Sequence, residues 1–240
     1  MRALSKTLAF AALAAIGSSA VEHATAVPSA ATARPGQPAP SFSAPDIAGK
    51  TVRLGDYAGK IVVLEWTNDG CPFVGKHYNS GNMQALQQKY TGTGVVWLTI
   101  ASSAPGEQGY VTPAEAKSDL ARWRATPTDF LLDPDGIVGH LYDARATPHM
   151  VVIDRAGRVA YMGAIDDTPS TRLADVKTAH NYVAAALDAT AAGQPVAIPS
   201  TPRLRLLDQI PGRVSPAILF AGFRCSRCYL QQNNSENIAL

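Results

Sequence analysis

Apolar runs mark two buried strands in the first half of the chain. Residues 61–66 (IVVLEW) and 94–101 (GVVWLTIA) are apolar almost throughout, which is typical of strands covered on both faces. Residues 50–54 (KTVRL) alternate polar and apolar side chains and predict an exposed strand.

Three segments predict helices. Residues 73–90 contain no proline, and Met83, Leu86 and Tyr90 recur at helical spacing. Residues 112–123 open with Thr-Pro-Ala-Glu, a good helix start. Residues 173–191 are rich in alanine and predict the last helix.

The second half adds a short strand at 129–133 (DFLLD) and a hairpin at 149–163. In the hairpin, Gly157 supplies the turn between two strands. The order is β, β, α, β, α, β, β, β, α. The β-α-β units require a partly parallel sheet, and the closing hairpin makes it mixed. The predicted class is α/β, a mixed central sheet flanked by helices, with an N-terminal strand extension.

The N-terminus predicts export. A basic start precedes the apolar run 8–17, and small residues ending at Ala20 or Ala26 offer cleavage sites. We interpret residues 1–26 as a signal peptide. The apolar run is too short to span a bilayer, and so is every later one. The expected location is therefore periplasmic or secreted, without stable membrane insertion.

The remaining chain divides into three parts. Residues 27–40 form a Pro- and Ala-rich linker, 41–192 the folded domain, and 193–240 an irregular C-terminal tail. The formal net charge is only +2, which suggests no nucleic-acid partner. Three cysteines are too few for a disulfide scaffold.

Cys71 is the candidate nucleophile. It follows an Asn-Asp-Gly turn and precedes Pro72 in the stretch WTNDGCPFV. Proline is favoured in the first helical turn, so Cys71 is expected at a helix N-terminus, where the dipole favours the reactive thiolate. Lys76 and His77 follow, but their spacing does not put them on the same helical face as Cys71. The alternative is a buried, inert cysteine.

These residues, in this order, make the chain resemble the thioredoxin-like redoxins, the extracytoplasmic group that includes thiol–disulfide oxidoreductases and AhpC/TSA-type peroxidases. The resemblance covers about 36–192. It rests on VVLEWTNDGCPFVGKHY (62–78), LLDPDG (131–136) and ATPHMVVIDRAGRVAYMG (146–163). It implies a thioredoxin-like fold.

The resemblance also implies roles near the cysteine. Pro148 stands where this fold keeps a cis-proline beside the active cysteine, and the backbone of Thr147 would then hydrogen-bond a bound partner. Arg145 would either stabilise a thiolate or peroxide oxygen or simply be solvated. Trp66 joins Thr147 and Arg145 among the expected substrate- or partner-binding residues.

Glu65 stands at the position of the buried acid that accepts a proton in thioredoxins. An acid inside an apolar strand has its pKa raised by desolvation. However, Trp66 lies one residue further from Cys71 than the tryptophan of thioredoxins, and a one-residue slip turns a side chain to the other face. Glu65 is therefore either a catalytic acid/base or a solvent-facing residue.

The pattern around Cys71 limits the reaction. Val74 stands where a second cysteine would complete Cys-x-x-Cys, and Asn68 stands where peroxiredoxins keep threonine. The leading hypothesis is a one-cysteine oxidoreductase, reducing peroxide or exchanging with protein disulfides, that needs an external thiol reductant and no metal or other cofactor. The alternatives are a non-enzymatic partner-binding module, and a copper-handling protein using Cys71 with His77.

The tail raises a separate question. Relatives resembling this chain end with a motif like Tyr-Gly-Cys-Ser-Ile-Lys-Tyr, and codons can be chosen for residues 204–210 that read as this motif when shifted by one base. We hypothesise a frameshift near Pro202. The gene sequence of codons 198–212 tests this, and codons that give no such motif in the shifted frame would contradict it. If the tail is out of frame, Cys225 and Cys228 have the spacing of a redox pair by chance. The alternative is that one of them serves as the resolving cysteine for Cys71. Their spacing also resembles half a zinc site, but the other ligands are missing.

Overall fold

The computed structural model describes residues 32–202. The predicted signal peptide, residues 27–31 of the linker, and the tail from residue 203 onward, with Cys225 and Cys228, lie outside these residues. The strands are β1 (Ser43–Pro45), β2 (Thr51–Arg53), β3 (Val62–Trp66), β4 (Val96–Ala101), β5 (Asp129–Leu132), β6 (His149–Ile153) and β7 (Val159–Gly163). The α-helices are α1 (Pro72–Asn79), α2 (Asn82–Thr91), α3 (Pro113–Trp123), α4 (Ile137–Leu141) and α5 (Tyr182–Ala191), with 3-10 turns η1 (Leu54–Tyr57) and η2 (Leu173–Lys177).

Five strands form the central sheet in the order β5-β4-β3-β6-β7. β3, β4 and β5 are parallel, whereas β6 pairs antiparallel with both β3 and β7. The predicted mixed sheet is confirmed, and so is the hairpin turn, in which Gly157 has a φ of 73°. This is a thioredoxin-like fold. β1 and β2 pair in a separate two-stranded sheet, which is the predicted N-terminal extension.

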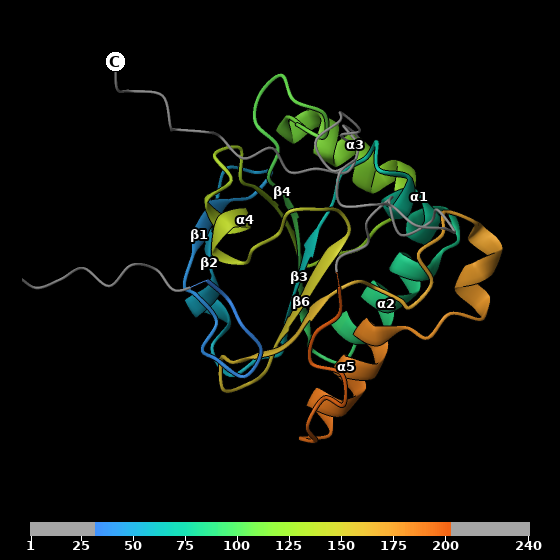
Figure 1. Cartoon of the computed structure of the whole chain (residues 1–240). Helices are drawn as coiled ribbons and strands as arrows, with labels where there is room; N and C mark the ends of the chain where they lie inside the picture. The colour runs from blue at the N-terminus through green and yellow to red at the C-terminus, as the bar shows by residue number, and fades with distance from the viewer. Residues whose placement is uncertain (1–31, 203–240) are drawn as a thin grey trace, which may run out of the picture.

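The sheet is covered on both faces, which explains its apolar strands. On one face, Val63 and Trp97 pack in a cluster that includes side chains of α1, α2, α3 and α5. On the other face, Val62 and Leu64 pack against residues from α4 and the β1–β2 extension. Figure 1 shows α1, α2 and α5 on one side of the sheet and α4 with β1 and β2 on the other. Among the described residues, no helix is long and apolar enough to cross a membrane.

Two helix predictions are wrong in their extent. The single helix predicted over 73–90 is two helices, because the chain turns at Gly81, whose φ of 79° is left-handed. The single helix predicted over 173–191 is the turn η2 followed by α5, which begins where the Asn181 side chain accepts a hydrogen bond from the Ala184 N–H. The short helix α4 was not predicted.

Candidate active site

Cys71 is the N-cap residue of α1. Its backbone is extended (φ −81°, ψ 121°), Pro72 occupies the first helical turn, and the Cys71 carbonyl accepts from the Gly75 N–H at 2.9 Å. The predicted helix start is therefore confirmed. The unpaired N–H groups and the positive end of the helix dipole at this position favour an anionic sulfur.

The sulfur of Cys71 lies beside the start of β6. Its thiol donates a hydrogen bond to the Thr147 carbonyl at 3.0 Å. The Thr147–Pro148 peptide is cis, as the sequence predicted. Cys71 is only 1% exposed, so a substrate reaches the sulfur only after a local movement of the surrounding chain.

Asn68 fixes the turn that leads into Cys71. Its carbonyl accepts from the Cys71 N–H at 3.0 Å, and its Oδ1 accepts from the Gly70 N–H at 3.0 Å. The side-chain amides of Asn68 and Gln108 also donate to each other, at 2.9 and 3.0 Å. Asn68 stands where peroxiredoxins keep threonine, and here its side-chain amide stabilises the turn before Cys71.

The loop that carries Gln108 packs closely against this turn. A Cβ at Gly109 would collide with the Asn68 side chain, and one at Gly70 would collide with the Gln108 amide. Both glycines are therefore required by close approach. Sequence reasoning missed Gln108; the adjacent glycine was the signal that the loop comes close to another segment.

Glu65 is buried, which settles the register question. Its carboxylate accepts hydrogen bonds from Tyr78 on α1 and from Gln87 on α2, at 2.7 and 3.2 Å. From β4, Trp97 Nε1 and the Thr99 hydroxyl donate to it at 2.7 and 3.2 Å. Burial raises the pKa of Glu65 above its ordinary value, while these hydrogen bonds act in the opposite direction. Because its partners Tyr78 and Gln87 lie on α1 and α2, Glu65 faces the helix layer that contains Cys71.

Trp66 faces the opposite side of the sheet. It is fully buried, and its indole N–H donates to Ser102 Oγ at 3.1 Å. Its ring lies against Tyr142 and His149, with centroid separations of 5.7 and 5.8 Å. The structure therefore presents Trp66 to the core and not to the surface that a partner would meet.

Arg145 is half-exposed. Its Nε donates to Asp143 at 2.5 Å, and the two side chains form an ion pair. This arrangement matches the solvated alternative for Arg145. The described contacts of Arg145 thus run along its own loop.

Lys76 and His77 are buried with Asp166. Lys76 Nζ lies 2.8 Å from an Asp166 carboxylate oxygen and 2.8 Å from the Thr168 carbonyl. His77 Nδ1 lies 2.9 Å from the Asn82 amide, and its Nε2 is 3.7 Å from Asp166. Burial, followed by Lys76, lowers the pKa of His77 to about 3, so its ring is neutral at physiological pH.

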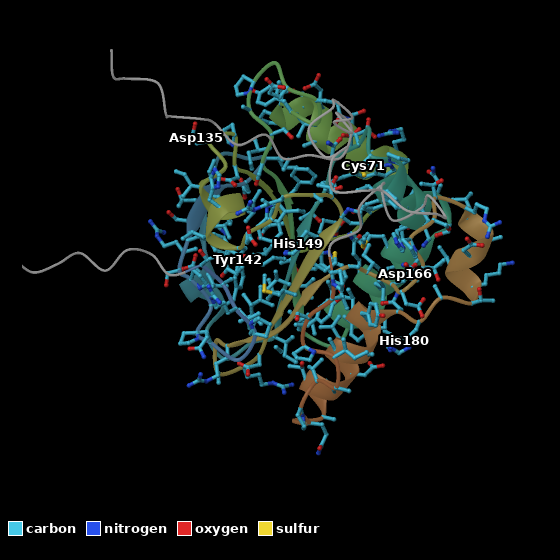
Figure 2. All side chains as sticks on the ribbon, in the orientation of Figure 1. Cys71, Asp135, Tyr142, His149, Asp166 and His180 are labelled. Atoms are coloured by element: carbon cyan, nitrogen blue, oxygen red, sulfur yellow. The ribbon has the colours of Figure 1, made fainter. Side chains whose placement is uncertain are left out.

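This cluster anchors α1 to the loop after β7. Figure 2 shows Cys71 and Asp166 on the α1 side of the sheet and Tyr142 on the other. Sequence reasoning gave Lys76 and His77 little weight, and Asp166 went unnoticed because its partner lies 90 residues away. Within 32–202, no three His, Cys, Asp or Glu side chains gather to hold a metal ion.

Comparison with known proteins identifies the family. The profile of the AhpC/TSA family matches residues 35–162, more than half of the chain. The chain belongs to the AhpC/TSA family. Thiol-based oxidoreduction is therefore its general chemistry, as the sequence predicted. Among proteins with curated descriptions, none matches this AhpC/TSA chain.

Solved structures resemble this AhpC/TSA protein over most of their own length. An uncharacterized conserved protein from Geobacillus kaustophilus is 27% identical, with a TM-score of 0.58 over 70% of this chain and 88% of the other. A hypothetical protein from Sinorhizobium meliloti is 23% identical, with a TM-score of 0.58 over 71% and 92%. A secreted disulfide oxidoreductase from Mycobacterium tuberculosis is 19% identical, with a TM-score of 0.41 over 49% and 79%.

Proposed function

We propose that this AhpC/TSA protein is a one-cysteine thiol oxidoreductase in which Cys71 is the nucleophile. The observation that carries the proposal is the position of the sulfur at the N-terminus of α1, 3.0 Å from the carbonyl of Thr147 beside the cis Pro148. The helix end stabilises a thiolate, and the backbone at 147 offers a polar contact to whatever approaches the sulfur. Pro148 belongs to the proposed catalytic set with Cys71, and Thr147 is the proposed binding residue, with Arg145 at a more exposed position.

The proposed reaction begins with the Cys71 thiolate attacking a peroxide. The sulfur takes one oxygen, the O–O bond breaks, and the other oxygen leaves as water or an alcohol after protonation. An external thiol then attacks the sulfenic acid, releasing water and forming a mixed disulfide. A second external thiol resolves the mixed disulfide and returns the Cys71 thiol.

Disulfide exchange is the second reaction of the same site. The Cys71 thiolate would attack a protein disulfide, displacing one sulfur as a thiolate. Val74 is buried at the position of a second cysteine, so the motif supplies no resolving sulfur. Both reactions therefore need an external thiol reductant.

Glu65 is the proposed proton-exchanging group of this site. Its pKa is raised by burial, which brings a carboxyl closer to neutral pH, where general acid/base chemistry is efficient. Its hydrogen bond from Tyr78 also ties it directly to α1, the helix that carries Cys71.

A partner-binding module is the second candidate function. The burial of Cys71 and the valine at 74 favour it, because both limit turnover. We do not propose copper handling, because the ring nitrogens of His77 face Asn82 and Asp166.

We further propose that the leader directs export to the periplasm or outside the cell. N-terminal sequencing tests this: a mature protein that starts after Ala20 or Ala26 supports export, and an intact Met1 contradicts it.

The deciding experiment is mass mapping after brief hydrogen peroxide treatment, with and without a sulfenic-acid trap. A trapped adduct on Cys71, retained in the Cys225→Ser/Cys228→Ser variant, supports the peroxidase reaction. Turnover of a protein disulfide without any adduct supports exchange. If Cys71 stays unmodified and gives no turnover with either substrate, the oxidoreductase proposal fails and the binding module leads.

A further inference from the structure

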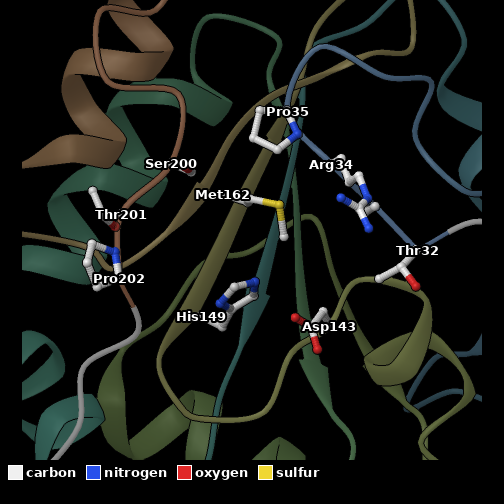
Figure 3. A pocket seen from close by; sticks show the side chains of 10 residues that line it. Thr32, Arg34, Pro35, Asp143, His149, Met162, Ser200, Thr201 and Pro202 are labelled. Carbon is white, nitrogen blue, oxygen red and sulfur yellow. The ribbon is translucent and has the colours of Figure 1, made fainter.

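A pocket of about 650 Å³ lies on the face of the sheet opposite to Cys71. His149 and Met162 line it from β6 and β7 (Figure 3). His149 is the cross-strand neighbour of Trp66 and lies with it on that face, whereas Cys71 belongs to the core cluster of the other face. The pocket therefore opens on the other face of the sheet from the Cys71 sulfur, and it shares with the candidate site only Asp143, the partner of Arg145.

The segment 32–35 forms one wall and is held at both ends. The Ala33 N–H donates to the Leu141 carbonyl at 2.8 Å, and the N–H of Gly36 donates to the Val159 carbonyl at 2.8 Å. This wall is therefore fixed by backbone hydrogen bonds to two separate elements.

The segment 200–202 forms the opposite wall. The Thr201 hydroxyl accepts from the Ala164 N–H at 2.9 Å, and the N–H of Thr201 donates to the Met162 carbonyl at 3.3 Å. Gly163 allows this approach, because a Cβ there would collide with Thr201. Both walls are thus preformed, as is usual for small-molecule sites.

His149 supplies a polar group that lacks a partner. Its side chain is 3% exposed, and its Nε2 has no hydrogen-bond partner. A buried polar atom without a partner costs free energy that a suitable ligand recovers. Burial lowers the pKa of His149 to about 4, so the ring is a neutral hydrogen-bonding group near pH 7.

Arg34 is the cation of the pocket lining. It is exposed at the rim and takes part in none of the ion pairs among residues 32–202. The acidic residue of the lining, Asp143, is already paired with Arg145 at 2.5 Å. Figure 3 shows Arg34, Asp143 and His149 around the same opening.

We propose that this pocket binds a small organic acid with a single carboxylate. The guanidinium of Arg34 pairs with the carboxylate, and the neutral imidazole of His149 hydrogen-bonds the ligand deeper in the pocket. Met162 and Pro35 contact the apolar part of the ligand. One unpaired cation matches one negative charge, which favours a monocarboxylate over a phosphate dianion. The proposal is independent of the thiol chemistry of Cys71.

The test titrates the full chain with hexanoate and, as a neutral probe of matched size, hexanamide. The readout is the ¹H–¹⁵N signal of the His149 imidazole, assigned by its loss in His149→Gln. Hexanoate is expected to shift this signal saturably at millimolar concentration, and hexanamide to bind about tenfold more weakly or less. Cys71→Ser should bind hexanoate unchanged.

Arg34→Gln is the decisive variant, with Arg155→Gln as its matched control because Arg155 is an exposed arginine in the β6–β7 turn. Arg34→Gln should weaken hexanoate binding at least about tenfold, and Arg155→Gln should leave it unchanged. Arg34→Lys, which keeps the charge, should restore part of the affinity. The proposal is overturned if hexanoate gives no saturable shift of the His149 signal or if hexanamide binds as tightly as hexanoate. It is also overturned if Arg34→Gln and Arg155→Gln lose the same amount of hexanoate affinity.

Discussion

The thiol of Cys71 donates a hydrogen bond to the carbonyl of Thr147, 76 residues further along the chain, at 3.0 Å. This contact joins the N-terminus of α1 to the first residues before β6. It brings together two of the three sequence segments that carried the family resemblance, 62–78 and 146–163. The site therefore depends on how firmly both segments are held.

Cys71→Ser should reduce peroxide or disulfide turnover at least about 100-fold while the protein still folds, since an alcohol is a far weaker nucleophile than a thiolate. The measurement is steady-state turnover with an external thiol, together with thermal unfolding. The Cys225→Ser/Cys228→Ser variant is the matched control and should keep the first, peroxide-dependent step. Equal turnover in Cys71→Ser and the wild type would contradict the assignment.

Asn68→Ala should make Cys71 react faster with iodoacetamide. The substitution removes the acceptor of the Gly70 N–H and the amide pair with Gln108, so the turn before Cys71 opens more often and exposes the buried thiol. We expect a destabilisation of about 1–3 kcal/mol and a severalfold faster alkylation. The measurement is the alkylation rate under native conditions.

Gln108→Ala should have the same effect, and the double variant should be less destabilised than the sum of the two. Groups that contact each other typically couple by about 0.5–3 kcal/mol. Gln88→Ala, at an exposed position on α2, is the control and should change neither rate nor stability appreciably. Additive effects of Asn68→Ala and Gln108→Ala would show that the amide pair does not act as a unit.

The sequence predicted most of what depends on local pattern. The apolar runs predicted β3 and β4, and the Cys71-Pro72 pair predicted the start of α1. The break between α1 and α2 was missed because Gly81 resembles an ordinary interruption of a helical pattern until its left-handed backbone is seen.

Contacts between distant segments could not be predicted. Glu65 could have faced either side, since the strand is apolar on both faces and gives no alternation to fix its register. Likewise, nothing local links Lys76 to Asp166 or Asn68 to Gln108. These pairings depend on the tertiary fold, which places loops from different parts of the chain side by side.

Lys76→Ala should destabilise the protein by about 3–5 kcal/mol, because it leaves the Asp166 carboxylate buried without its cation. Lys89→Ala is the matched control. Lys89 pairs with Asp188 at 3.1 Å, but both side chains are more than half exposed, so the loss should be below about 1 kcal/mol. Urea unfolding of both variants measures the difference. Similar losses would mean that the Lys76 pair adds no more than a surface contact.

Glu65 should impose a pH dependence on stability. Because burial raises its pKa in the folded state, the folded protein binds the proton more tightly than the unfolded chain, and ionisation costs stability. This cost is absent below the unfolded pKa, near 4.3 to 4.5. It grows as pH rises from there to the folded pKa and is constant above it. In Glu65→Gln the cost disappears, while a glutamine oxygen can still accept from Trp97 and its amide can donate to Tyr78.

The free energy of unfolding of the wild type should therefore fall relative to Glu65→Gln as pH rises above about 4.5. Glu115→Gln is the control of opposite sign. Glu115 is exposed, and its hydrogen bonds with Thr112 at the start of α3 lower its pKa. The ionised Glu115 side chain stabilises the folded state, and this stabilisation is lost as pH falls. The free energy of unfolding of the wild type should therefore fall relative to that of Glu115→Gln in acid. Urea unfolding from about pH 3 to pH 8 measures both differences. If the free energy of unfolding of the wild type, relative to Glu65→Gln, is constant or rises with pH, the fold stabilises the Glu65 carboxylate in its ionised form. Glu65 would then be unsuited to exchange protons near neutral pH.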